Sequence, residues 1–314
     1  MPEPSEPEHP PAAAALVPVA TGAQPGAPSR RSRRSRQEAS PAPTSRAGRD
    51  LPAAIAVGVG LGVVAAASLF LRREAFVALV AVALCLAVWE LHQAFAARRI
   101  TVPVVPLLIG TVGMQVSAYA GGREGLLVAF VLTALGLLVW RVVDGAQGAV
   151  RDVAAGVFTA AYGPLLAGFA VLMVAEEDGA WRIFTFIVVA ICSDIGGYAF
   201  GVRWGRHPLA PSVSPKKSWE GLAGSVLFSM VAGVATVTLT LDGRWWAGLV
   251  LGAAAVVTAT VGDLSESLLK RDLGIKDMGS ILPGHGGIMD RIDSLLPTAP
   301  VTYLLLLVLV PVGG

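Results

Sequence analysis

Long apolar stretches separated by short polar ones dominate the chain from residue 50 onward. Nine of these stretches are long enough to cross a hydrocarbon layer, which is roughly 30 Å thick. They run over Leu51–Leu71, Phe76–Phe95, Val102–Ala120, Leu126–Val143, Val153–Val174, Trp181–Phe200, Leu222–Leu241, Trp246–Leu264 and Leu295–Val312. Alternation with a period of two is missing, and the stretches are too long for barrel strands. The pattern predicts an all-α integral membrane protein with about nine transmembrane helices.

The composition also favours a membrane protein over a soluble domain. The 314 residues are 54% hydrophobic and 15% charged, with a mean hydropathy of +0.66. Cys85 and Cys192 both fall within apolar stretches, so they indicate neither a disulfide framework nor a paired-cysteine metal site. The glycines of "VGVGLGVV" lack a preceding strand and a following Walker lysine, so we interpret them as helix-packing residues.

Residues 1–49 differ from the rest of the chain. They are rich in Pro, Ala, Ser, Glu and Arg without a sustained apolar period, which predicts a disordered tail. The acidic, proline-rich start argues against a cleaved signal peptide. Seven arginines lie between Arg30 and Arg49, beside the first span. This position indicates a cytoplasmic tail near anionic lipid rather than nucleic-acid binding, and leaves residues 50–314 as the polytopic membrane domain.

Loop charges assign the sides of the membrane. With the arginine-rich tail in the cytoplasm, the basic loops after the second, fourth, sixth and eighth helices all lie at the cytoplasmic face. The acidic loop "AEEDGAW", near Glu176, lies on the opposite side. Arg72 and Arg73 in the first hairpin are exceptions to this rule. The pattern predicts a multi-pass protein of the inner, cytoplasmic membrane with its polar loops in the cytoplasm.

Two cytoplasmic loops combine charges with glycines. The first contains "SPKKSWEG", and the second leads from the eighth helix to the ninth. Because both loops face the cytoplasm, we expect them to form one site. The polar residues in or beside these loops are Ser193, Asp194, Tyr198, Lys216, Lys217, Asp263, Glu266, Ser267, Lys270, Arg271, Lys276, Asp277, His285, Asp290, Arg291 and Asp293.

The acids of this set suit a hard metal ion. Asp263 and Lys270 share one helical face, and Asp290 and Asp293, three residues apart, share another. Several carboxylates without a His or Cys cluster favour Mg²⁺ over zinc. For Asp263 and Asp194, the alternative is pairing with a nearby Lys or Arg at the membrane surface.

The basic residues and glycines of the same loops suit phosphate groups. The glycines of "PGHGG" allow backbone amides to approach an oxyanion closely. A metal and phosphates at a membrane surface together favour phosphoryl or nucleotidyl transfer. Glu90 and His92, near the inner end of the second helix, either line this site or pair at the interface.

The segment "SLLKRDLGIKDMGSILPGHGGIMDRID", residues 267–293, resembles the signature of phosphatidate cytidylyltransferases, also called CDP-diacylglycerol synthases. Every fixed position of that signature is present, and "SPKKSWEG" looks like a second block of the family, with Ser218 where Thr is common. The resemblance covers about residues 50–314. It implies the reaction of CTP with phosphatidate, giving CDP-diacylglycerol and pyrophosphate in phospholipid biosynthesis.

The resemblance also implies roles for individual residues and partners. Asp263 and Asp290 match the leading metal ligands. The catalytic set it implies is Asp263, Asp290, Lys270, Arg271, Asp277 and Asp293. The substrate-binding set is Lys216, Lys217, Ser267, Lys276, His285, Gly286, Gly287, Arg291 and Asp194. Mg²⁺, with room for a second cation such as K⁺, is the expected cofactor; CTP, inner-leaflet phosphatidate, membrane lipids and a second copy of the chain are the expected partners.

Three other activities are alternatives to cytidylyl transfer. A CTP-dependent lipid kinase would transfer the γ-phosphate to a polyprenol, and its products separate it from cytidylyl transfer. CDP-alcohol phosphotransfer fits poorly, because "DGAQGAVRD" at Asp144 lacks the later acids of that motif. In an ion-coupled transporter, Asp194, Asp263 and Glu90 would be coupling carboxylates, but such groups usually lie near the bilayer midplane rather than at one face.

Overall fold

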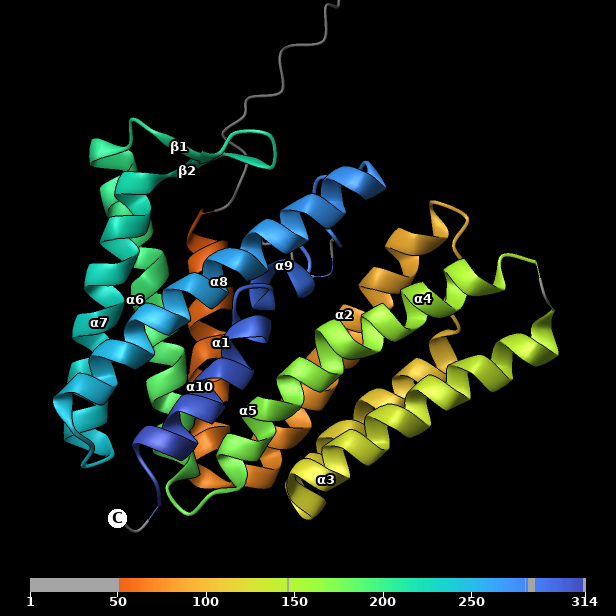
Figure 1. Cartoon of the computed structure of the whole chain (residues 1–314), viewed down its shortest axis with the longest axis horizontal. Coiled ribbons are helices and arrows are strands. Elements are labelled where there is room, and N and C mark those ends of the chain that lie inside the picture. The colour runs from red at the N-terminus through yellow and green to blue at the C-terminus, as the bar shows by residue number, and fades with distance from the viewer. Residues whose placement is uncertain (1–50, 146, 280, 282–285, 313–314) are drawn as a thin grey trace, which may run out of the picture. The chain divides into compact units, whose positions relative to one another are not determined.

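The computed structural model describes residues 51–145, 147–279, 281 and 286–312, with side chains from residue 58 onward. Helices account for most of these residues (Figure 1). The elements are α1 (Leu51–Leu71), α2 (Arg73–Ala96), α3 (Val104–Asp144), α4 (Ala149–Ala160), the π-helical turn η1 (Ala161–Leu165), α5 (Leu166–Ala175), α6 (Gly179–Trp204), β1 (Pro208–Ala210), β2 (Ser214–Ser218), α7 (Trp219–Thr240), α8 (Trp245–Leu273), α9 (Met289–Ile292) and α10 (Leu295–Leu309). The tail predicted to be disordered lies outside the described residues.

Each of the nine predicted apolar stretches is helical. Within the described residues, seven helices are long and apolar enough to cross a membrane, and Gly58–Leu71 of α1 is a shorter apolar helix. One of the seven, α3, contains two of the predicted stretches. Between them its backbone leaves the helical conformation at Gly122, with φ 62° and ψ −149°, so α3 consists of two helical arms. Gly110 lies so close to Thr133 that no side chain would fit between them. The two arms of α3 therefore run side by side, as separate helices would.

The fifth predicted helix is interrupted. It consists of α4, η1 and α5, which together span Ala149–Ala175. Pro164 lies in the π-helical turn and cannot donate a backbone hydrogen bond. Gln115 of α3 donates to the carbonyl oxygen of Pro164 at 2.9 Å, so a neighbouring helix satisfies an acceptor at the interruption.

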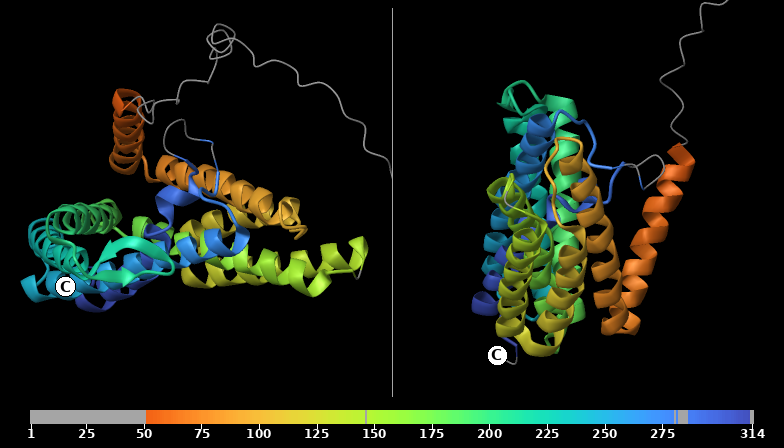
Figure 2. Two further views of the ribbon diagram at one scale, coloured as in Figure 1. Left: turned by 90° about the horizontal axis from the view of Figure 1, so that it is seen from above. Right: turned by 90° about the vertical axis from the view of Figure 1, so that its right-hand side faces the viewer.

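Close backbone contacts join α6, α7 and α8. A Cβ atom at Gly196 of α6 would lie 2.4 Å from the carbonyl oxygen of Gly224 in α7, and one at Gly233 of α7 would lie 2.3 Å from that of Gly248 in α8. Small residues let helices approach in this way where lipid provides no hydrophobic drive for association. Figure 2 shows α6, α7 and the β hairpin on one side of the bundle and the arms of α3 on the other, and α8 runs from the first side across the bundle (Figure 1).

The loop after α6 contains strands that the all-α prediction did not include. β1 and β2 pair antiparallel, with Pro208 opposite Ser218 and Ala210 opposite Ser214. Ser218, where the family signature commonly has Thr, accepts a hydrogen bond from the amide of Gly221 at 3.1 Å and so caps α7. The hairpin therefore places the paired lysines of β2 directly at the start of a helix.

Arg73, one of the two topological exceptions, has a structural explanation. Its guanidinium donates to the carbonyl oxygens of Glu176 at 2.7 Å and Glu177 at 2.5 Å, in the loop between α5 and α6. The basic first hairpin and the acidic loop therefore lie at the same end of the bundle. This end is opposite the one that carries the β hairpin (Figure 1).

Candidate active site

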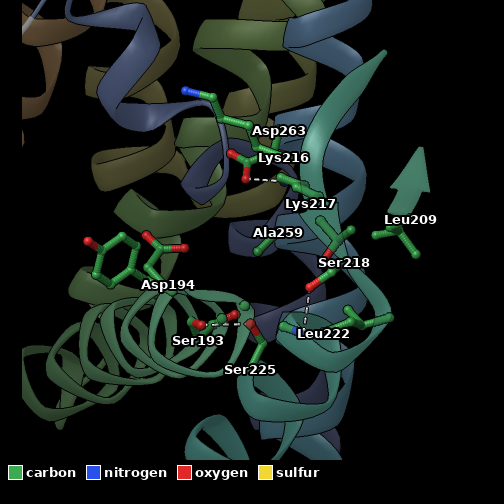
Figure 3. A pocket seen from close by; sticks show the side chains of 15 residues that line it. Ser193, Asp194, Leu209, Lys216, Lys217, Ser218, Leu222, Ser225, Ala259 and Asp263 are labelled. Atoms are coloured by element: carbon green, nitrogen blue, oxygen red, sulfur yellow. Dashed lines mark hydrogen bonds and ion pairs between the residues drawn. The ribbon is translucent and has the colours of Figure 1, made fainter. Parts of the chain in front are cut away.

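A polar pocket of about 230 Å³ lies between α6, the β hairpin, α7 and α8. Lys217 of β2 forms an ion pair with Asp263 of α8 across it, and Asp194 and Tyr198 of α6 also line it. Figure 3 shows Asp194 on one side of the pocket, apart from the pair formed by Lys217 and Asp263. The pocket therefore combines residues of the first predicted loop with residues of α6, α7 and α8, whereas none of its described lining residues comes from the segment between α8 and α9.

Three carboxyl groups meet beside this pocket. The carboxyl of Asp293 lies close enough to those of Glu266 and Asp263 for hydrogen bonding. Glu266 is only 1% exposed, and its buried Oε1 atom has no hydrogen-bond partner among the described residues. Asp263 and Asp293 are only partly buried, but carboxylates this close to one another still need a shared proton or a cation. We refer to Asp263, Glu266 and Asp293 as the acid cluster.

Lys270 connects the acid cluster to the segment between α8 and α9, which we call the signature loop. Its ammonium lies 2.9 Å from Glu266 Oε2 and 2.8 Å from Asp290 Oδ1. Asp290 also accepts hydrogen bonds from the amides of Met278 at 3.1 Å and Gly287 at 2.9 Å. The Asp290 carboxylate is thus held by one lysine and by amides from two separate parts of the loop.

Two glycines of the signature lie close to a carboxylate of the protein itself. Gly286 has a positive φ of 85°, and a Cβ atom there would lie 3.3 Å from Asp290 Oδ2. A Cβ atom at Gly287 would lie 3.0 Å from the same oxygen and 2.7 Å from Glu90 Oε2. The predicted close approach of backbone to an oxyanion therefore takes place, with Asp290 as the oxyanion in this structure. His285 lies outside the described residues.

A second pocket, of about 480 Å³, lies between β2 and the end of α8. Its lining includes four basic residues and Ser267. The basic residues are Lys216, Lys270, Arg271 and Lys276. Lys216 also lines the first pocket, so the two cavities share a wall. We refer to this second cavity as the basic pocket; its charge suits a polyphosphate.

Two predicted site residues are less closely joined to these pockets. Asp277 is exposed and lines neither pocket, and Arg291 points outward from α9 as an exposed side chain with interactions of its own. Their predicted roles in the reaction stay predictions. The remaining predicted residues within the described part of the chain line the two pockets or contact the acid cluster and Asp290.

The donor chemistry of the site fits Mg²⁺. Within the described residues no group of three His, Cys, Asp or Glu side chains is arranged to hold a metal ion. The acid cluster nevertheless offers hard oxygen donors, among them the unpartnered Glu266 Oε1, beside a pocket suited to phosphates. Lys217 and Lys270 are the cations that contact these acids here. The assignment of a metal to Asp263 and Asp290 stays a prediction.

Three residues to which the family signature assigns no role lie in or beside the site. Glu266 belongs to the acid cluster, and Glu90 of α2 accepts hydrogen bonds from the signature loop. Tyr162, in the π-helical turn, has a buried hydroxyl that finds no hydrogen-bond partner in the described part of the chain, and it lies within electrostatic range of all three cluster acids. An acid within an apolar helix was a signal for the two glutamates. The Gly-Pro step after Tyr162 was a signal for an interrupted helix.

Residues 52–309 match the cytidylyltransferase family, and the chain belongs to that family. It is a membrane-embedded member with apolar helices around a polar site at one end. A phosphatidate cytidylyltransferase of Mycobacterium bovis is 42% identical over 279 residues, covering 85% of this chain and 91% of the relative. One of Mycobacterium leprae is 42% identical over 282 residues, covering 85% and 90%. A phosphatidate cytidylyltransferase of Haemophilus influenzae is 40% identical over 123 residues, covering 38% and 42%.

Proposed function

We propose that this protein is a phosphatidate cytidylyltransferase, which makes CDP-diacylglycerol and pyrophosphate from CTP and phosphatidate. The observation that carries the proposal is the juxtaposition of the basic pocket with the acid cluster at the end of a membrane-spanning bundle. The mycobacterial relatives, similar over most of their length, carry the same activity in their names. The family and the site chemistry thus point to the same reaction.

In the proposed reaction, an oxygen of the phosphatidate phosphate attacks the α-phosphorus of CTP. A new P–O bond forms there as the bond from that phosphorus to the β-phosphate bridging oxygen breaks. The attacking phosphate is already anionic, so the step needs no strong general base. Catalysis then consists mainly of placing two anions in line and stabilising the negative charge on departing pyrophosphate.

The basic pocket is the proposed site for the triphosphate. Lys216, Lys270, Arg271 and Lys276 line it, and their charges would offset those of the β- and γ-phosphates. The polar pocket beside Asp194 and Lys217 would then receive the lipid phosphate, with the acyl chains remaining along the apolar helices. Lys216 lines both cavities and is suited to contact both substrates.

The proposed cofactor is Mg²⁺, which would be held by the acid cluster together with Asp290. When bound, Mg²⁺ supplies positive charge to the phosphate oxygens. Without it, Lys217 and Lys270 keep the acids in position. A second cation such as K⁺ is part of the same proposal, and replacing K⁺ with Na⁺ in the assay tests it.

We also propose that the site faces the cytoplasm, where CTP is found, in the inner membrane. The polar loops at this end are basic, and the opposite loop around Glu176 is acidic, in agreement with the positive-inside rule. A homodimer is proposed from the family resemblance, and the mass of the detergent-solubilised protein tests it. Accessibility of single cysteines introduced beside Lys276 and beside Asp178 tests the orientation.

The decisive experiment measures pyrophosphate release and lipid products from purified protein in detergent with CTP, Mg²⁺ and short-chain phosphatidate. We expect CDP-diacylglycerol, and loss of on the order of a thousandfold in Asp290→Asn, as expected for removal of a charge-stabilising group. Formation of CDP and a phosphorylated polyprenol would instead indicate the lipid kinase. Ion transport by vesicles containing the protein, without turnover of CTP, would support the transporter.

A further inference from the structure

Helix α2, far from the signature in sequence, contacts the signature loop where its backbone enters α9. Both oxygens of Glu90 are used there: Oε1 accepts from the amide of Ile288 at 3.0 Å and Oε2 from the amide of Met289 at 2.9 Å. Glu90 is 1% exposed. A buried carboxylate in an apolar helix is costly, and its retention here indicates a function.

The turn that follows α2, which ends at Ala96, contacts the other end of the loop. Arg98 donates from Nε to the carbonyl oxygen of Leu273, the last residue of α8, at 2.7 Å. The next residue, Gly274, has a φ of 65°, and a Cβ atom there would lie 2.3 Å from the guanidinium. Arg98 therefore occupies the space that a side chain at position 274 would need.

Two described glycines of the loop, Gly279 and Gly287, lie against the Glu90 carboxylate. A Cβ atom at Gly279 would lie 2.3 Å from Glu90 Oε1, and one at Gly287 would lie 2.7 Å from Oε2. Gly287 is also the residue whose amide donates to Asp290. A shift of the Glu90 carboxylate would thus displace backbone that holds the Asp290 side chain.

We propose that Glu90 and Arg98 are positioning residues that hold the two ends of the signature loop so that Lys270 and Asp290 face each other at 2.8 Å. Neither residue touches substrate in this proposal. Glu90 acts through the backbone of residues 287–289, and Arg98 acts through the end of the helix that carries Lys270. The inference rests on the proposed cytidylyl transfer for its kinetic consequence, whereas its structural consequence is independent of the reaction.

The test compares Glu90→Gln and Arg98→Gln with a control, Arg182→Gln. Arg182 is buried, whereas Arg98 is exposed, but both donate to a backbone carbonyl oxygen at 2.7 Å: Arg182 to that of Val310 at the opposite end of the bundle, and Arg98 to that of Leu273. A glutamine at position 90 keeps the shape but offers only one of the two acceptor oxygens. Each variant is assayed for kcat, KM for CTP, and tryptic cleavage after Lys276 in detergent.

We expect kcat to fall about tenfold to a hundredfold in Glu90→Gln and about tenfold in Arg98→Gln, the range for residues that orient catalytic groups. KM for CTP should change by less than about threefold, because the substrate contacts remain. Cleavage after Lys276 should become faster in both variants. Arg182→Gln should keep both the wild-type kcat and the wild-type rate of cleavage.

The proposal would be overturned if Glu90→Gln and Arg98→Gln kept the wild-type kcat and the wild-type rate of cleavage. It would also be overturned if their losses only followed the fraction of folded protein and Arg182→Gln showed losses of the same size. If Glu90→Gln does not fold, Arg98→Gln and the milder Arg98→Lys decide by the same measurements. A wild-type protein that makes no CDP-diacylglycerol would refute the proposed function, and the cleavage rates would still decide on the loop contacts.

Discussion

The two ends of the bundle use charged side chains differently. At the end opposite the site, arginines are satisfied by backbone and by a near neighbour: Arg73 binds two loop carbonyls, and Arg182 binds Asp178 and the carbonyl of Val310. At the site, side-chain charges contact one another, and one oxygen of Glu266 has no hydrogen-bond partner within the described segments.

The difference distinguishes charged side chains that stabilise the fold from charged side chains that are available to bind a ligand. Carbonyl groups at helix ends and in loops are fixed, so an arginine bound to them closes the structure. Where flexible lysines hold carboxylates, the lysines can turn to phosphates and the carboxylates to a metal ion at little structural cost. The following predictions test this contrast between the site and the opposite end.

The largest effect is expected from removing the central cation of the site. Lys270→Met would leave Glu266 and Asp290 without their shared lysine and would remove one charge from the basic pocket. We expect kcat/KM to fall roughly a thousandfold. Lys276→Met is the comparison, because it also removes one charge from the basic pocket but leaves the ion pairs of Glu266 and Asp290 in place; we expect a smaller loss, and equal losses in both variants would show that these ion pairs do not matter.

Glu266→Gln tests whether the unpartnered oxygen serves a cation. The substitution keeps the size of the side chain but removes a negative charge from the acid cluster. We expect kcat to fall about tenfold to a hundredfold, and the Mg²⁺ concentration for half-maximal activity to rise. An unchanged Mg²⁺ dependence, even with lower activity, would argue against a cation at this position.

A smaller effect is expected at the rim of the basic pocket. Arg271 is exposed and lines this pocket with its guanidinium in reach of solvent. Arg271→Gln should raise KM for CTP roughly tenfold, the size of one lost charge-assisted hydrogen bond, with kcat nearly unchanged. Added salt should reduce the difference between the variant and the wild type. A change in kcat alone would place Arg271 outside the triphosphate site.

Much of this architecture could be predicted from the sequence because its signals are local. Apolar length identified the helices, and loop charge identified the end that carries the site. The β hairpin was missed because strands of three and five residues give no usable period. Helix α8 continues to Leu273, beyond the apolar stretch ending at Leu264, because polar residues can extend a helix outside the membrane.

Contacts between residues far apart in the sequence could not be predicted from the spacing of motifs. Glu90 and Met289 are separated by 199 positions, and nothing in either neighbourhood specifies that they meet. The pairing of Lys217 with Asp263 was anticipated only as a general alternative for a membrane acid. The signature located the site, whereas the packing of α2 and α8 determined which charges face one another.

The smallest catalytic effect, and the clearest contrast, is expected at the opposite end of the bundle. Arg182→Gln removes the hydrogen bonds to Asp178 Oδ1 at 2.5 Å and to the carbonyl of Val310 at 2.7 Å. We expect a stability loss of about 2 kcal/mol, because bonds to a charged group are lost from a buried position. This corresponds to a fall of about 4 to 8 °C in Tm for a chain of this size.

Thermal unfolding in detergent and kcat measured well below Tm check this expectation together. Stability should fall while kcat stays within about twofold of the wild type, because only the folded fraction changes. If Arg182→Gln lowered kcat as strongly as Glu266→Gln does, both ends of the bundle would contribute to catalysis. The distinction between charges that complete the fold and charges that serve the reaction would then be wrong.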